Sequence, residues 1–205
     1  MLYVDDHGYV DAERIIVKIF NKIQRGEMDQ VNGIVVHQTD SPTASSTFNS
    51  YQNAGANGAH FLIDRDGTIY QTASLHRVTW HVGRMQSRCV LTKKCQPAEL
   101  KKMLDLENAG RNKEVNRLEK QKNFPDRFPN NTDSIGIEIV GMAKGVYMDN
   151  NKKVDVYEVV NELQNNSLKW LLYELTDTLK VPMSEIYRHP DIGRKNPTEA
   201  STAKW

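Results

Sequence analysis

The sequence has 205 residues, 26% charged and 39% hydrophobic, with a formal net charge of +1. This length suffices for one globular domain with a buried core and is short for two. The near-zero charge argues against a nucleic-acid partner, and no apolar run of about 18 residues is present to span a membrane. We therefore expect one soluble domain over residues 1–205.

Apolar spacing predicts a helix and then a strand in the N-terminal part of the chain. Residues 11–25 carry apolar side chains at helical spacing, and Gly26 would end the helix. The apolar run 31–36 is typical of a buried central strand, and it ends at His37.

The next segment predicts a short helix and a hairpin. After a break at 41–43, we expect the helix over 44–51. Residues 58–70 contain two apolar runs on either side of Asp66-Gly67, which is the strongest short-range signal for a hairpin.

The middle of the chain is charged and helix-prone over 97–122, with Gly110 dividing it. We interpret residues 85–130 as a charged helical insertion or flap that packs on one side of the domain.

The C-terminal half alternates strand and helix again. Residues 134–140 predict a strand, and residues 154–179 predict a long helix that Val181-Pro182 ends. Strands interleaved with helices indicate an α/β fold, a single domain with a central mixed β-sheet flanked by helices. The core residues expected from the long helix are Val159, Leu163, Leu168, Leu171, Leu172, Leu175 and Leu179.

The cysteines and the N-terminal residues indicate in which cellular compartment the protein would act. Cys89 and Cys95 either form a local disulfide, as an oxidising compartment allows, or stay unpaired. Acidic residues interrupt the first 20 positions, so no secretory signal peptide is predicted. The protein would stay where it is made, leave by a route other than Sec, or have a signal outside this sequence.

Two of the six histidines stand where a metal ligand would be well held. His37 follows the apolar run 34–36, and His189 follows Ile186-Tyr187. A side chain at a strand end is fixed by the sheet and faces its open edge, which suits metal ligation. The alternative is a buried histidine with a purely structural role.

Five segments in a fixed order resemble a known enzyme family. They are Ile34–Thr39 (IVVHQT), Gly58–Gly67 (GAHFLIDRDG), Trp80–Gly83 (WHVG), Ser134–Gly141 (SIGIEIVG) and His189–Lys195 (HPDIGRK). Together they resemble the zinc-dependent N-acetylmuramoyl-L-alanine amidases, the superfamily that includes peptidoglycan recognition proteins and phage amidases. The resemblance runs from about position 31 to 199 and does not cover the charged insertion.

The resemblance implies a role for each matching residue. His37 and His189 would be zinc ligands. Glu138 would activate the water, and Lys195 would stabilise the oxyanion. One branch of the family uses a hairpin tyrosine instead of the glutamate, but Ala59 stands at that position, which favours Glu138. The candidates for substrate contact in the groove are His60, Trp80, His81 and Tyr187.

The third ligand departs from the family's pattern. The family places Asp or Cys two residues after the lysine, where this sequence has Pro197. Glu199 is the nearest competent group, and it would complete a site of two histidines and one carboxylate with a position open for water. The alternatives are a degraded site, Glu199 as the catalytic carboxylate instead of Glu138, or a ligand from His60, His81 or Asp191.

The implied reaction is hydrolysis of the amide bond between the N-acetylmuramoyl group and L-alanine of the peptidoglycan stem peptide. Zinc would lower the pKa of water to about 7 and polarise the carbonyl. Glu138 would move the proton to the leaving amine, and Lys195 would offset the oxyanion's charge. The competing function is a non-catalytic peptidoglycan-binding module, because recognition proteins of this fold can lose a zinc ligand.

Three biological settings fit such a sequence. They are a type VI antibacterial effector with an immunity protein as partner, a phage endolysin and a cytoplasmic recycling enzyme. The charged insertion and the cysteine pair favour the first two. We therefore expect action in the periplasm or cell wall, after a cytoplasmic stage and export without a Sec signal.

Overall fold

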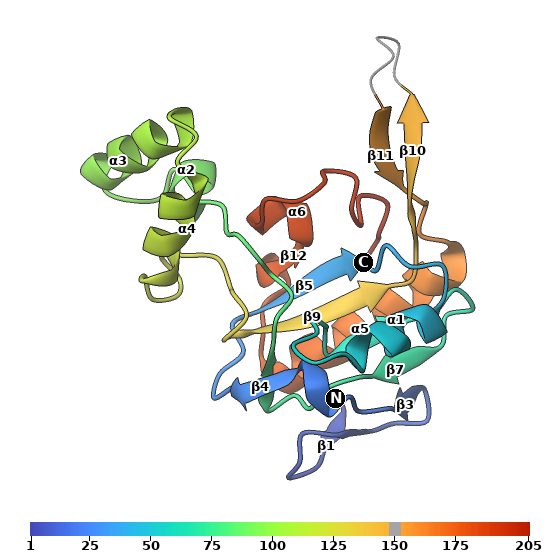
Figure 1. Ribbon diagram of the computed structural model, residues 1–205. Coiled ribbons are helices and arrows are strands. Elements are labelled where there is room, and N and C mark those ends of the chain that lie inside the picture. Colours follow the sequence, from blue (N-terminus) through green and yellow to red (C-terminus); the bar gives the residue numbers. More distant parts are fainter. Residues whose placement is uncertain (148–152) are drawn as a thin grey trace.

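The computed structural model describes residues 1–147 and 153–205, and a six-stranded mixed sheet forms its centre (Figure 1). The strand order is β12-β5-β9-β6-β7-β3. Strands β12, β5, β9 and β6 run parallel, β7 is antiparallel to β6, and β3 is parallel to β7. This confirms the predicted α/β class. The strands are β3 (Ile15–Val17), β5 (Gly33–Gln38), β6 (Phe61–Ile63), β7 (Ile69–Gln71), β9 (Ser134–Ile139) and β12 (Ile186–Arg188).

Helices and smaller strand pairs surround this sheet. The helices are α1 (Ala44–Tyr51), α2 (Arg88–Thr92), α3 (Pro97–Asn108), α4 (Asn112–Lys120), α5 (Glu162–Leu179) and α6 (His189–Ile192), with 3₁₀ turns η1 (Asn21–Ile23) and η2 (Met183–Glu185). The strand pairs are β1 (Tyr3–Val4) with β2 (Val10–Asp11), β4 (Gln24–Glu27) with β8 (Arg77–Thr79), and β10 (Ala143–Tyr147) with β11 (Lys153–Tyr157). The β10–β11 pair projects from the body as an arm (Figure 1).

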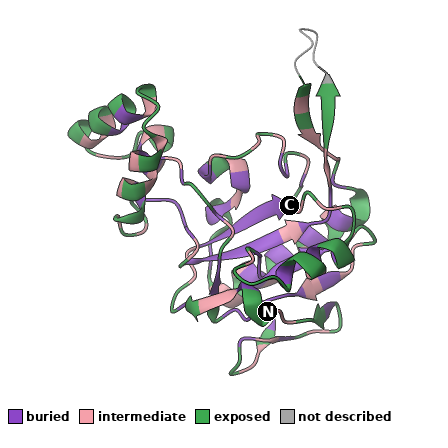
Figure 2. Cartoon of the chain, viewed as in Figure 1, coloured by how far each residue is buried: buried purple, intermediate pink, exposed green. Residues whose placement is uncertain are grey.

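The side-chain alternation of the parallel strands separates the core from the site. Successive side chains of a strand point to opposite faces of its sheet. Ile34 and Val36 of β5 pack with Ile135 and Ile137 of β9 in the main core, which α5 covers from behind the sheet (Figure 1). The strands are accordingly buried on both faces over most of their length (Figure 2). The alternate positions, including His37, therefore face the other side.

The helix predicted over residues 11–25 is wrong. Residues 15–17 instead form β3, which adds to the free edge of β7. Three consecutive β-branched residues lose side-chain freedom in a helix and suit a strand. Ile15 is buried in the main core, whereas Ile16 and Val17 are largely exposed.

The long C-terminal helix is shorter than the predicted 154–179. It begins at Glu162, where Asn161 and Gln164 form a capping box, while residues 153–157 form β11. Two expected core residues are therefore wrong, because Val159 precedes the helix and is 74% exposed and Leu163 is 56% exposed. Leu168, Leu171, Leu172 and Leu175 are fully buried, and Leu179 packs partly against the same core.

The segment interpreted as an insertion holds α2, α3 and α4, which extend away from the sheet (Figure 1). These helices bury Met103, Leu106 and Val115 in a small core of their own. Cys89 of α2 and Cys95, between α2 and α3, form a disulfide, so the first of the two alternatives for the cysteines holds in the structure.

Two neighbouring leucines of α5 test the position of the core. Leu168→Ala empties a fully buried site, so we expect the free energy of unfolding to fall by about 3 kcal/mol. Leu163→Ala, on the exposed face, is expected to change it by less than about 0.5 kcal/mol. Urea unfolding of both variants measures the difference, and equal losses would contradict the observed burial.

Candidate metal centre

The carboxyl ends of three parallel strands bring the candidate ligands to one edge of the sheet. His37 of β5 lies in register with Glu138 of β9, and both point away from the main core. On the other side of β5, Arg188 of β12 pairs with Val36, so His189 enters α6 beside His37. The edge where parallel strands end is the usual place for a ligand in an open α/β sheet.

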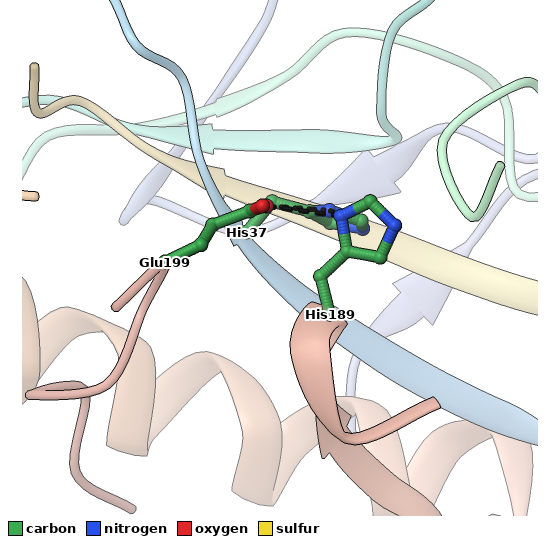
Figure 3. A group of neighbouring side chains, drawn as sticks. All are labelled: His37, His189 and Glu199. Carbon is green, nitrogen blue, oxygen red and sulfur yellow. Dashed lines mark hydrogen bonds and ion pairs between the residues drawn. The ribbon is translucent and has the colours of Figure 1, made fainter. Parts of the chain in front are cut away.

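Glu199 joins the two histidines from the C-terminal loop (Figure 3). Nδ1 of His37 lies 2.8 Å from Nδ1 of His189, and Oε1 of Glu199 lies 3.0 Å from the His189 atom and 3.4 Å from the His37 atom. All three side chains are buried. The structure thus brings together the three residues predicted as metal ligands.

Hydrogen bonds on the far side of each ring determine which nitrogen is free. Nε2 of His189 lies 2.7 Å from the carbonyl oxygen of Val82, so it donates, which leaves Nδ1 as the ring nitrogen available to a metal ion. Nε2 of His81 lies 3.3 Å from the carbonyl oxygen of Ser134, and Nδ1 of His81 lies 3.0 Å from Nε2 of His37. We therefore assign a relay in which His37 donates to His81, leaving its own Nδ1 free.

This donor set fits a zinc ion. Two imidazole lone pairs and a carboxylate converge on one point, and ligand atoms of a tetrahedral zinc site lie about 3.3 Å apart. Burial, followed by the charge of His189, lowers the pKa of His37 to about 4, so its ring is neutral at pH 7. Burial alone would raise the pKa of Glu199, but an N–H group or a positive charge on His189 and His37 outweighs burial and lowers it to about 2. A metal cation held at the same point would favour the ionised carboxylate in the same way. Neutral histidines and an ionised carboxylate are the forms that bind a cation.

The loop that carries His81 is held in place from two directions. The side-chain oxygen of Asn131 accepts hydrogen bonds from the backbone N–H groups of His81 and Val82, at 3.0 and 2.8 Å. Gly136 of β9 leaves room for the ring, because a Cβ there would lie 2.9 Å from Cγ of His81. The same loop therefore supplies hydrogen-bond partners to both candidate ligands, His37 and His189.

Glu138 lies in the same cavity, which has a volume of about 830 Å³. Its Oε2 atom is buried and has no hydrogen-bond partner among residues 1–147 and 153–205. Burial, reinforced by the charge of Glu199, raises the pKa of Glu138 to about 8. A carboxyl group with such a pKa can take up and release a proton near neutral pH.

Lys195 and Trp80, both predicted from the sequence as site residues, also line this cavity. Trp80 is 47% exposed, and the guanidinium of Arg25 lies 4.4 Å from the centre of its ring. Arg25 is itself anchored on the carbonyl oxygens of Lys22 and Ala56. One face of the indole is thus supported from within the protein.

Three other candidates lie outside the cavity. His60 is fully buried, where Nε2 donates to the carbonyl oxygen of Arg77 and Nδ1 accepts from the N–H of Gly136. Tyr187 donates its hydroxyl to Glu185, and exposed Asp191 caps the N–H of Arg188. We assign His60 and Tyr187 structural roles and do not propose them as substrate contacts.

Sequence reasoning missed two tyrosines that line the cavity, Tyr51 of α1 and Tyr157 of β11. Burial raises the pKa of both, with a further rise from Glu138 at Tyr51 and from Glu199 at Tyr157. Asn131 was missed as well. No local pattern singles out these residues, since α1 and the arm reach the site through tertiary packing.

The chain matches one protein family and shares its fold with known structures. A family model described as N-acetylmuramoyl-L-alanine amidase matches residues 27–200. A selenomethionine AmpD derivative has a TM-score of 0.55 at 16% identity, covering 100% of this chain and 96% of its own. AmpDh3 from Pseudomonas aeruginosa has a TM-score of 0.53 at 20% sequence identity, and the match covers 98% of this chain and 63% of AmpDh3. A mutant endolysin from Bacillus subtilis has a TM-score of 0.51 at 18% identity, and the match covers 89% of this chain and 88% of the endolysin. At such identities these structures show a shared fold. No curated protein matches the sequence.

The relay through His81 predicts a specific effect on metal binding. His81→Leu removes the acceptor for His37, so we expect zinc affinity to fall about 10- to 100-fold. His81→Asn offers a carbonyl oxygen near the position of Nδ1 and is expected to recover most of that loss. Competition with a chromophoric chelator measures both, with circular dichroism as the check on folding. Wild-type affinity in a folded His81→Leu variant would contradict the relay.

Proposed function

Because the chain belongs to the N-acetylmuramoyl-L-alanine amidase family, we propose that it is a zinc-dependent peptidoglycan hydrolase. The bond it cleaves is the amide between the N-acetylmuramoyl group and L-alanine of the stem peptide. The observation that carries this proposal is the convergence of His37, His189 and Glu199 beside Glu138 in one cavity.

The ligand set supports zinc as the metal. Two histidines and one carboxylate with an open position form a common set in hydrolytic zinc sites. Bound there, zinc would lower the pKa of water and polarise the scissile carbonyl. The remaining tasks fall to the protein's own side chains.

Glu138 is the group we propose to move the proton. Within the described ranges, its Oε2 atom forms no hydrogen bond, so it is free to accept a proton from a water in the cavity. A nearby cation favours the ionised carboxylate and would bring its pKa down from about 8 toward neutral. Glu138 could then deliver that proton to the departing amine.

Lys195 and Trp80 complete the substrate contacts. Lys195 lines the cavity, and its ammonium would offset the negative charge that develops on the carbonyl oxygen. The supported indole of Trp80 offers an apolar face on which a sugar ring can stack.

The alternative of a non-catalytic binding module is disfavoured by the C-terminal loop. Its main support is Pro197, which stands where the family commonly has a ligand. Glu199, two residues later, lies against both histidines and offers the missing carboxylate. Retention of Glu138 in the same cavity also favours an enzyme.

We further propose that the protein acts outside the reducing cytoplasm, in the periplasm or cell wall. The Cys89–Cys95 disulfide supports this, because such bonds persist in oxidising compartments. Within the described ranges, no helix has both the length and the apolar character needed to cross a membrane. An effector or endolysin role, export without a Sec signal and an immunity protein as partner stay predictions.

Separate substitutions distinguish the metal ligand from the proton carrier. Glu199→Ala removes the carboxylate ligand, so we expect loss of stoichiometric zinc together with activity. Glu138→Gln keeps the shape of the side chain without its proton transfer, so zinc should stay bound while activity falls at least about 100-fold. Elemental analysis and release of stem peptides from purified peptidoglycan measure the two effects. Full zinc content in Glu199→Ala would overturn the ligand assignment.

Metal binding is also expected to stabilise the fold. Zinc that binds only the native state adds about 2.7 kcal/mol when free zinc is 100 times its dissociation constant. We therefore expect zinc to raise the Tm of chelator-treated wild-type protein and to leave the Tm of Glu199→Ala nearly unchanged. Differential scanning calorimetry tests this, and equal shifts in both proteins would place the ion elsewhere.

A further inference from the structure

Backbone contacts bring three separate segments together along one wall of the cavity. The N–H of Arg194, after α6, donates to the carbonyl oxygen of Arg84 at 2.8 Å. The N–H of Met85 donates to the side-chain oxygen of Asn116 on α4 at 2.9 Å. The charged segment 85–130 is therefore attached to the site through α4 as well as through the chain itself.

A cationic side chain reaches the cavity from each of these segments: Arg84, Lys120 and Lys195. Lys120 follows Asn116 by one helical turn, so it lies on the face of α4 that holds Met85. Cε of Lys195 would lie 3.8 Å from a Cβ built on Gly83, which places this side chain against the same loop.

The cations that neighbour this wall already have acidic partners. Arg194 pairs with Glu107 of α3, Arg88 pairs with Glu185, and Lys122 pairs with Glu119 and Glu99. In the part of the chain that the structure describes, Arg84, Lys120 and Lys195 form no ion pair. The acids Glu99, Glu107, Glu119 and Glu185 are thus already paired with other cations, while the three positive charges that line the cavity stay available to a ligand.

We propose that Arg84 and Lys120 form a subsite that binds free carboxylates of the stem peptide. A guanidinium can hold a carboxylate through two parallel hydrogen bonds, and an ammonium adds a second charge-assisted bond. Lys195 serves the scissile carbonyl in the proposed function, on which this inference rests. The charged segment would then confer a preference for acidic peptides, which the sheet and its ligands do not supply.

Two synthetic N-acetylmuramoyl peptides test this subsite. They are identical except that the peptide carboxylates are free in one and converted to carboxamides in the other. Binding is measured by calorimetry in a zinc-loaded Glu138→Gln background, in which the peptides are not consumed. We expect the free acid to bind about tenfold more tightly, with a preference that shrinks as salt is added.

Paired variants locate the preference. Arg84→Gln combined with Lys120→Gln is expected to remove it, whereas Lys102→Gln should retain it. Lys102 is an exposed lysine of α3 that lines a separate hollow, which makes it a matched control. In the otherwise wild-type enzyme, the double substitution should raise KM for the free acid about tenfold with little change in kcat.

Two results would overturn the subsite: equal binding of the two peptides, or an unchanged preference in the double variant. Failure of the zinc-loaded wild type to hydrolyse either peptide would count against the amidase proposal instead. Since binding is measured without turnover, the calorimetric comparison still decides the subsite in that case.

Discussion

Two imidazole lone pairs and a carboxylate held within 3.4 Å of one another form the constraint on which the site depends. Like partial charges at such distances repel unless a cation lies between them. A proton moved from Nε2 to Nδ1 of either ring would relieve that repulsion. The hydrogen bonds of His189 to Val82 and of His37 to His81 keep the proton on Nε2. The arrangement is therefore prepared for a metal ion.

The parallel sheet holds this arrangement without loss of core packing. Residues 34 and 36 of β5 bind the strand into the main core, and the alternation of side chains then turns His37 to the opposite face. The same alternation in β9 buries residues 135, 137 and 139 and leaves Glu138 in the cavity. Fold stability and chemistry thus share strands but use different faces.

Sequence patterns captured the elements whose signal is local. The apolar run before His37, the turn at Asp66-Gly67 and the strand around Glu138 all appear as predicted. The helix predicted over 11–25 failed because β7 offers a free edge that no local pattern reveals. The segment 154–161 failed because its partner, β10, lies earlier in the chain.

The candidate site shows the same division. His37, Glu138 and His189 follow from strand ends and family motifs, whereas the place of Glu199 depends on how the C-terminal loop folds back. The sequence predicts His60 and His81 alike as substrate contacts in the groove, and no local pattern distinguishes them. Only packing shows that His60 is enclosed by backbone groups and that His81 supports a ligand.

Zinc K-edge X-ray absorption of the loaded protein would test the metal centre most directly. We expect nitrogen and oxygen neighbours at about 2.0–2.2 Å, with the outer-shell scattering of two imidazole rings. No sulfur should appear, because Cys89 and Cys95 are joined to each other. A sulfur neighbour at about 2.3 Å, or a zinc ion without imidazole scattering, would contradict a centre built from His37, His189 and Glu199.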